Sequence, residues 1–267
     1  MVASEMRPQR PTFIDHHPAF NASGYTITNE EPKMFTKLLD GVEGIKLAGG
    51  ICSGGEVPLQ VLLPLASEAV YAIDHGLKAL AVTYLKAVML AQLGPKAFKA
   101  LFVEKVYQDF KKAMTEAHKE LLPALAKEIV TDGYYLTFDS TSFNLSLKRE
   151  WGDEHGPSEA DLELAFKKLD KLTLIHGDLT DLKDVAPPLD VLYISNACGH
   201  SGRSKSYPKP DQFAPLVRED GLMLSVEERT STFWESVKKD WGSRSCWTHT
   251  LYKKRSVVPD TARGLTT

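Results

Sequence analysis

The chain has 267 residues, and its 32 Lys and Arg residues nearly balance 35 Asp and Glu residues, which leaves a formal net charge of -3. This length suits one α/β domain with insertions. The charge excludes a general nucleic-acid binder, which needs a concentrated basic surface. The 3 cysteines lie far apart and exclude a disulfide framework or a paired zinc site.

Along the chain, the first predicted element is a buried strand at Ile45–Ala48, which glycines end. An apolar segment, Val57–Leu65, follows as a helix that Pro64 should end or kink. A second strand is predicted at Ala69–Ile73, and a helix at Leu77–Leu93. This alternation of strand and helix is typical of a parallel sheet.

The middle of the chain departs from that alternation. A charge-rich helical pattern covers Ala97–Val130 and is broken once, at Pro123; its Lys and Glu residues indicate a solvated helix face. The stretch Tyr134–Gly156 has many aromatic residues and no sustained period, which favours a lid over a site. Ser158 then begins the capping-box motif SEAD of a helix that reaches Leu169.

The parallel-sheet pattern returns in the last third. Further strands are predicted at Leu172–Ile175, Leu189–Ile194 and Gly221–Val226. A helix over Ser231–Trp241 and a final edge strand over Trp247–Tyr252 complete the prediction. The sequence therefore predicts about six strands.

The domain organisation follows from these elements. We expect an N-terminal cap segment (1–40), one Rossmann-like domain (41–257) with a helical and lid insertion at about 95–157, and a flexible tail (258–267). The start is expected to be flexible up to about Phe13. No segment approaches the roughly 20 apolar residues that span a bilayer, and the N-terminus lacks the order of a secretory signal. We expect a cytoplasmic protein that is not an integral membrane protein; its oligomeric state stays open, a monomer included.

The most informative motif lies between the first strand and its helix, in LAGGICSGGE. Glycines there let main-chain atoms approach a ligand, and a helix start offers unpaired N–H groups. Asp74 ends the second strand, where an acid commonly takes the two hydroxyls of a ribose, and His75 follows it. The motif thus predicts an adenosine-type ligand. The candidate cofactor-binding residues of the loop are Gly49, Gly50, Ser53, Gly54 and Gly55.

A pyrophosphate is disfavoured at this site. GGICSGG does not match the dinucleotide pattern GxGxxG, and no GKS or GKT follows. Glu56 would repel a phosphate but could hold the ammonium of a methionyl group. The alternative interpretation is that Glu56 is an acid at the start of a helix and interacts with the dipole of that helix. S-adenosylmethionine fits this pattern. Asp178 would accept from the adenine amino group, with Leu179 beneath the ring, and no metal is expected.

Several stretches together resemble a known family. YTITNEEP, SGGE, VYAIDHGLKAL and DVLYISN, over about residues 24–102 and 172–197, are similar to the aminocarboxypropyl transferases related to the betaine-lipid enzyme that alkylates diacylglycerol. The resemblance implies a class I methyltransferase-like fold and S-adenosylmethionine as group donor. It implies that Ser53, Gly54, Gly55 and Asp74 bind the cofactor, that Asn196, after Ser195, lies beside the sulfonium, and that Glu30 and Glu31 close the site.

The acceptor region departs from that family. After Asn196 the sequence ACGHSGRSKSYP replaces an aromatic-rich region, so the lipid acceptor is not carried over. His200 is the candidate base, since neutral imidazole accepts a proton near pH 7; a surface histidine is the alternative. Tyr25 or Tyr193 could face the cationic sulfur, although core packing is favoured for Tyr193.

These observations predict an S-adenosylmethionine-dependent transferase with a small-molecule substrate. The main hypothesis is transfer of the 3-amino-3-carboxypropyl group from the methionyl γ-carbon, with release of methylthioadenosine. An intramolecular version would cyclise the donor to azetidine-2-carboxylate. The alternatives are a small-molecule methyltransferase of the same fold and a noncatalytic adenosine-ligand sensor.

Overall fold

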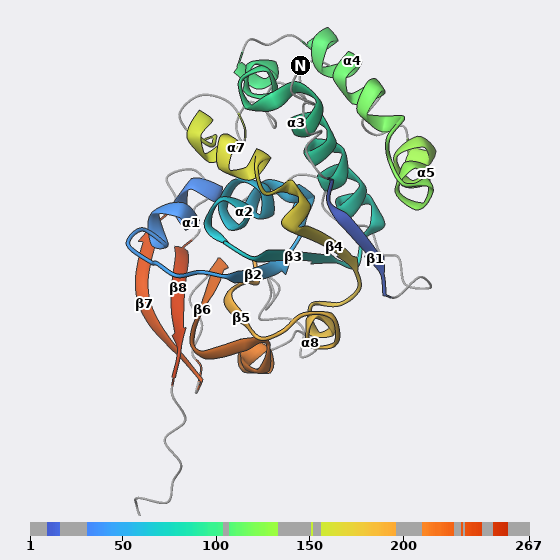
Figure 1. Cartoon of the computed structure of the whole chain (residues 1–267). Coiled ribbons are helices and arrows are strands. Elements are labelled where there is room, and N and C mark those ends of the chain that lie inside the picture. Colours follow the sequence, from blue (N-terminus) through green and yellow to red (C-terminus); the bar gives the residue numbers. More distant parts are fainter. Residues whose placement is uncertain are drawn as a thin grey trace, which may run out of the picture.

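The eight strands form one sheet in the order β1-β4-β3-β2-β5-β6-β8-β7 (Figure 1). The computed structural model describes residues 10–16, 31–103, 107–132, 151, 156–195, 210–226, 231, 233–241 and 248–255. Neighbouring strands from β1 to β6 pair in parallel, and β8 pairs antiparallel with both β6 and β7. The strands are β1 (Thr12–Asp15), β2 (Leu47–Ile51), β3 (Ala69–Asp74), β4 (Leu172–His176), β5 (Leu189–Tyr193), β6 (Val217–Val226), β7 (Trp234–Trp241) and β8 (Thr248–Lys254).

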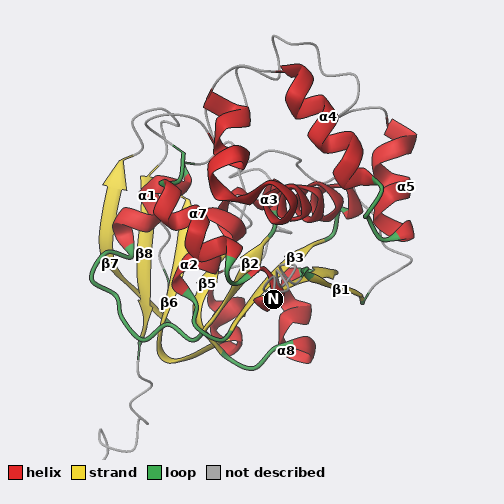
Figure 2. Cartoon of the chain, turned by 45° about the horizontal axis from the view of Figure 1, so that its top comes forward, coloured by secondary structure: helices red, strands yellow, loops and turns green. Residues whose placement is uncertain are grey.

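Helices cover both faces of the sheet, so the predicted α/β class is confirmed. On one face lie α1, α2, α3 and α7, with α4 and α5 packed outside α3; α8 and a 3₁₀ segment, Pro210–Leu216, cover the other face (Figures 1 and 2). The helices are α1 (Pro32–Leu38), α2 (Leu63–Leu65), α3 (Leu77–Val103), α4 (Tyr107–His118), α5 (Pro123–Asp132), α7 (Glu159–Phe166) and α8 (Leu182–Val185). A π-helical turn, Pro58–Leu62, leads into α2.

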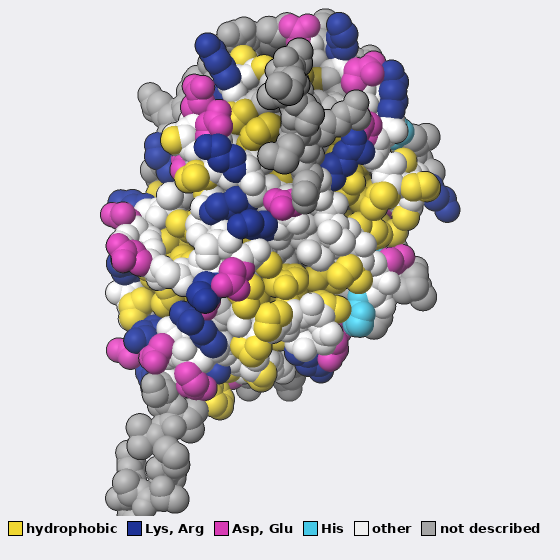
Figure 3. Space-filling model, in the orientation of Figure 1, with side chains coloured by type: hydrophobic (Ala, Val, Ile, Leu, Met, Phe, Trp, Pro, Cys, Tyr) yellow, Lys and Arg dark blue, Asp and Glu magenta, His cyan; other side chains and the backbone are white. Residues whose placement is uncertain are grey.

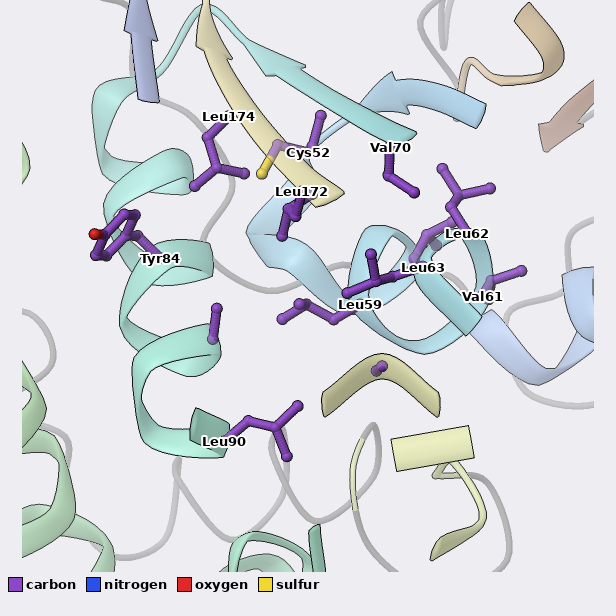
Figure 4. Close-up of a cluster of buried hydrophobic side chains, with 14 of the residues drawn as sticks. Cys52, Leu59, Val61, Leu62, Leu63, Val70, Tyr84, Leu90, Leu172 and Leu174 are labelled. Atoms are coloured by element: carbon purple, nitrogen blue, oxygen red, sulfur yellow. The ribbon is translucent and has the colours of Figure 1, made fainter. Parts of the chain in front are cut away.

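The core is divided by the sheet into two apolar layers. Every residue of β5 is buried, because a parallel strand in the middle of the sheet is covered on both faces. The larger layer joins α2 and α3 to the sheet, where Leu59 and Leu63 face Leu172 of β4 (Figure 4). The smaller layer lies under α8. Both faces of the sheet are thus covered by apolar contacts.

Helix α3 is longer than predicted and is bent. Gly94 has a φ of 74° inside it, directly before Pro95, so the helical path changes direction there. Further along, the helical structure is interrupted between α4 and α5, at residues 119–122. Pro123 indicated this interruption. By length and composition Leu77–Phe102 could cross a membrane, but 67% of its most apolar window is buried inside the protein. The apolar composition of α3 is explained by the core.

Two predictions for the C-terminal region are wrong. The predicted helix over Ser231–Trp241 is strand β7, in which Trp234 is buried while Val237 is 46% exposed. Antiparallel pairing with β8, irregular between Ser236 and Lys238, overrides the local pattern. The strand predicted over Trp247–Tyr252 exists as β8 but is paired on both sides. The edge position belongs to β7.

The N-terminal segment also differs from its prediction. Phe13, placed at the end of a flexible start, lies in β1, which pairs in parallel with β4 from Thr12 to Asp15. This strand adds an edge to the sheet beyond the six expected strands. The capping box at Ser158 is confirmed, since its side chain accepts from the Asp161 backbone N–H. The tail from 258 lies outside the described residues.

The surface charge agrees with the small net charge of the sequence. On the face seen in Figure 3, Lys and Arg side chains are interspersed with Asp and Glu side chains. Such a mixed surface does not give the single-sign field that steers a nucleic acid.

Candidate functional site

The glycine loop begins where β2 ends, at the carboxyl edge of the sheet. Ser53, Gly54 and Gly55 follow one another with φ values of 40°, 80° and 93°, so the chain takes a tight left-handed path. The Gly55 N–H donates to the Cys52 carbonyl at 2.7 Å. The loop therefore presents main chain rather than side chains at this edge.

Two of the glycines are required by contacts inside the protein. A Cβ on Gly50 would lie 2.0 Å from the Tyr193 carbonyl oxygen of β5. A Cβ on Gly55 would lie 2.7 Å from the Thr83 side chain of α3. These positions are glycine because the neighbouring strand and helix approach closely. The interpretation that they serve close approach to a ligand stays a prediction.

Asp74 connects the tip of β3 to the glycine loop. Its Oδ2 accepts from the Ser53 N–H at 3.2 Å, and its Oδ1 accepts from the Gly76 N–H at 2.9 Å. The side chain is 7% exposed. Burial raises the pKa of the Asp74 carboxyl above its ordinary value, while the Gly76 N–H, the charge of His75 and the Ser53 N–H act in the opposite direction. A partly desolvated carboxylate thus stands at the edge beside the loop.

Cys52, immediately before the loop, is not a nucleophile. Its Sγ lies 2.9 Å from Thr83 Oγ1, and the side chain packs in the apolar layer near Leu174 (Figure 4). Burial, followed by the charge of Asp74, raises the pKa of the Cys52 thiol far above its ordinary value. The thiolate that nucleophilic chemistry needs is therefore absent near neutral pH.

Glu56 is fully buried and meets an ammonium of the protein itself. Its Oε1 contacts Lys86 Nζ and accepts from Trp151 Nε1 at 3.2 Å. This carboxylate therefore already has a cationic partner within the protein. The contact of Glu56 with a cofactor ammonium stays a prediction. Neither Lys86 nor Trp151 was singled out from the sequence as a site residue. The available signal was Lys86 itself, a lone charge in the apolar run Ala79–Leu90.

The next strand along the edge, β4, ends near Asp74. Asp178 follows it and caps the turn Leu179–Asp181 by accepting from Thr180 N–H at 2.9 Å and from Thr180 Oγ1 at 2.7 Å. Leu179, the next residue, is buried. His176, the register partner of Asp74, lies 2.8 Å from Asp15 of β1 through its Nδ1. The predicted adenine-binding pair therefore directly follows the strand that neighbours the predicted ribose-binding acid.

On the other side of the loop, β5 ends at Tyr193, and Ser195 follows it by two residues. This buried residue has a φ of 54°, and its carbonyl accepts from the Val226 N–H at 3.1 Å. Glu31, which precedes α1, is buried as well. Phe35 of α1 packs edge-on against Tyr193, with ring centroids 5.2 Å apart. Tyr193 is thus a core residue, as favoured, and α1 packs against the end of β5.

The three residues predicted to be catalytic, Tyr25, Asn196 and His200, lie outside the described residues, as does Glu30. The structure consequently gives the predicted cofactor-binding side of the site but neither the base nor the acceptor pocket. Their assigned roles stay predictions.

A metal site is not indicated by the groups that the structure brings together. Within the described part of the chain, ligand atoms of His16, Asp181 and Asp184 lie within 4.8 Å of one another. All three side chains are at least partly exposed, and Asp181 Oδ2 already accepts from the Asp178 N–H at 2.6 Å. Exposed acidic groups of this kind are common without an ion. The expectation of a metal-free protein stays a prediction.

Comparisons with known proteins give matches of low similarity. No family model matches the chain, and no curated protein does. TrmN from Thermus thermophilus matches 84% of this chain, which spans 48% of TrmN, with 9% identity and a TM-score of 0.40. SMU.1697c from Streptococcus mutans, in complex with SAH, matches 86% of this chain over its full length, with 8% identity and a TM-score of 0.38. The ribosomal protein L11 methylase from Lactobacillus delbrueckii subsp. bulgaricus matches 84% of this chain and 77% of its own, with 8% identity and a TM-score of 0.37.

The strand order itself identifies the fold. The series β4-β3-β2-β5-β6-β8-β7, with β8 antiparallel between β6 and β7, is the Rossmann-like arrangement of class I methyltransferases. The predicted fold class is therefore confirmed. Ligands of such sheets bind at the carboxyl ends of the strands, near the point where the strand order reverses between β2 and β5.

Proposed function

We propose that the protein is an S-adenosylmethionine-dependent transferase that binds this donor at the carboxyl edge of β3, β2 and β5. The observation that carries the proposal is the buried Asp74 carboxylate, which accepts one N–H from the glycine loop and one from Gly76. An ionised carboxylate has about four acceptor positions. Two remain for the hydroxyls of a ribose, so the donor set fits an adenosine group.

The charges around the loop support a ligand without phosphate. Asp74 lies directly against the loop N–H of Ser53, where a pyrophosphate would bring further negative charge. Lys86, which donates to the Gly54 carbonyl of the loop, is already paired with Glu56. A ligand with a ribose and a positively charged sulfur avoids that repulsion. Asp178 would take the adenine amino group, since its Oδ1 alone is engaged by Thr180.

S-adenosylmethionine supplies an electrophilic carbon next to a sulfonium, so the chain has to orient the donor and exclude water. Orientation of this kind contributes about 7 to 11 kcal/mol to lowering a barrier. Asp74 and the glycine loop would fix the nucleoside end. Helix α1, with Glu31 before it, would close the site beside Tyr193.

The group that we propose to be transferred is 3-amino-3-carboxypropyl, with methylthioadenosine as the nucleoside product. The specific observation in its favour is the buried Glu31, because the resemblance to the aminocarboxypropyl transferases assigns this acid to closing the site. Packing of Phe35 in α1 against Tyr193 brings the helix that follows Glu31 next to the end of β5, which supports this proposal. Methyl transfer from the same cofactor site is the second candidate. It is supported by the shared strand order, which is that of methyltransferases.

The nucleoside product separates the two transfers. We expect incubation of the protein with S-adenosylmethionine alone, followed by mass spectrometry, to yield methylthioadenosine if the donor cyclises or reacts with water. Methylthioadenosine that forms only with added nucleophiles would indicate an intermolecular transfer. S-adenosylhomocysteine as the product would establish methyl transfer and contradict the γ-carbon proposal.

The affinity for the donor should depend on pH through Asp74. The folded, ligand-free protein has a raised carboxyl pKa at this residue, chiefly because of burial. Ribose hydroxyls donate to the ionised form, so affinity is full above the raised pKa and falls as the pH drops through it. Because that pKa is raised, the loss begins at a higher pH than for an ordinary Asp, whose pKa is about 3.9. Calorimetric titrations with S-adenosylhomocysteine from about pH 8 downward measure it. A Kd that stays constant down to the pKa of an exposed Asp would contradict this role of Asp74.

A further inference from the structure

A buried charged network lies directly behind the glycine loop. Lys86 of α3, 3% exposed, donates from Nζ to the Gly54 carbonyl at 2.8 Å and contacts Glu56 Oε1. Trp151 donates to the same carboxylate oxygen, and its ring lies 5.5 Å from Lys86 Nζ. The ammonium is therefore surrounded by a loop carbonyl, a carboxylate and an aromatic face.

Trp151 is fixed by aromatic contacts to the same helix. Its ring packs edge-on against Phe98, with centroids 5.3 Å apart, and stacks on Phe102 at 5.6 Å. Helix α3 thus supplies both the ammonium and the surface that holds the indole. The network joins α3 to one particular residue of the loop, Gly54, whose φ is 80°.

Stability alone is a weak reason for this arrangement. A buried ion pair loses hydration on both partners, and replacing the pair by apolar side chains of similar volume is often neutral or stabilising. The charge-assisted bond from Lys86 to Gly54, by contrast, acts on the conformation of the loop. The same loop holds the Ser53 N–H against Asp74.

We propose that Lys86 is a positioning residue for the donor: held by Glu56 and Trp151, it fixes the Gly54 carbonyl and with it the loop that binds the nucleoside. This rests on the proposed function. Without the ammonium, the loop can depart from its left-handed conformation. The conformation that binds the donor is then populated less. Donor affinity then falls even when the fold is intact.

The experiment compares donor affinity and stability in two variants. Lys86→Met removes the ammonium that faces the buried Glu56 carboxylate, so it should lower the melting temperature and raise the Kd for S-adenosylmethionine about tenfold or more. The double variant Glu56→Gln with Lys86→Met removes both charges and should regain melting temperature while its affinity stays weak. Hydrogen exchange should be faster at the Ser53 and Gly55 amides in both variants, and unchanged in β3.

Lys168 provides the matched control. Its Nζ also donates to main-chain carbonyls, those of Pro64 at 2.6 Å and Ala66 at 2.9 Å, but these lie just before β3, at the opposite edge of the sheet from the loop. Lys168→Met should leave the Kd within about twofold of the unchanged protein.

The outcomes separate the two proposals. If the unchanged protein binds S-adenosylmethionine and the double variant binds it equally well, the positioning role of Lys86 is overturned and the proposed function stands. Recovery of affinity together with stability in the double variant would likewise reduce Lys86 to a structural role. Absence of binding by the unchanged protein overturns both proposals.

Discussion

Asp74→Ala should raise the Kd for S-adenosylmethionine by about 100-fold or more, measured by calorimetry. The carboxylate would accept two ribose hydroxyls, and a hydrogen bond to a charged group contributes about 1.5 to 3 kcal/mol. The loss of two such bonds corresponds to about two orders of magnitude in Kd at the lower end of this range. The substitution also releases the Ser53 N–H, which loosens the glycine loop.

Asp190, near the start of β5, offers a control at the opposite edge of the sheet from Asp74. This buried carboxylate also accepts two backbone N–H groups, from Lys46 at 2.6 Å and Leu47 at 2.8 Å, and it pairs with Arg218 at 2.6 Å. Asp190→Ala should lower stability by about 1 to 3 kcal/mol through the unsatisfied N–H groups. Its donor affinity should not change. If both variants lose affinity equally, the effect of Asp74 is a consequence of destabilisation, and the ribose assignment fails.

Gly50→Ala should largely prevent folding. The added Cβ would lie 2.0 Å from the Tyr193 carbonyl oxygen, and the φ of 152° is one that side chains rarely allow. The Cβ is attached directly to the main chain of β2 and the carbonyl belongs to the main chain of β5, so the clash is relieved only if the two paired strands separate. We expect a loss of more than about 4 kcal/mol in the free energy of unfolding, a large share of the total stability of a domain. Denaturant unfolding followed by circular dichroism measures it.

Gly41→Ala is the matched variant for this change. Gly41 has a φ of 76°, but a Cβ there meets nothing within 4 Å. Gly41→Ala should lower the free energy of unfolding only by the strain of an alanine in the left-handed conformation, about 1 to 2 kcal/mol. A Gly50→Ala protein that unfolds at the same denaturant concentration as Gly41→Ala would show that the contact between β2 and β5 is not rigid.

Short apolar runs between glycines and polar turns were sufficient to predict the strands in the centre of the sheet. The predicted strand Ala69–Ile73 agrees with β3 to within one residue, because a strand covered on both faces needs an apolar run. At the periphery of the sheet, local patterns do not predict the strands. Trp234 and its neighbours form β7 instead of a helix, because partner strand β8 supplies hydrogen bonds that the local pattern does not encode. Strand β1 was missed for a related reason, since four residues pair with β4 from far away in the sequence.

For the site, local order and tertiary contact contributed different parts. The glycines, Asp74 and Asp178 could be assigned to one edge from the sequence, because the carboxyl ends of parallel strands meet at one edge. The partner of Glu56 could not, since Lys86 lies thirty residues away on a helix whose rotation only packing sets.

The sequence by itself determined that a glycine loop and two acids follow successive strands, because short apolar runs and turn residues are local signals. Only the tertiary structure decided that Gly50 and Gly55 have no room for a Cβ, because Tyr193 and Thr83 lie too close. It also decided that Glu56 faces Lys86 rather than open solvent. The physical reason is that steric exclusion and charge pairing act between atoms that come together only when the sheet and α3 have packed.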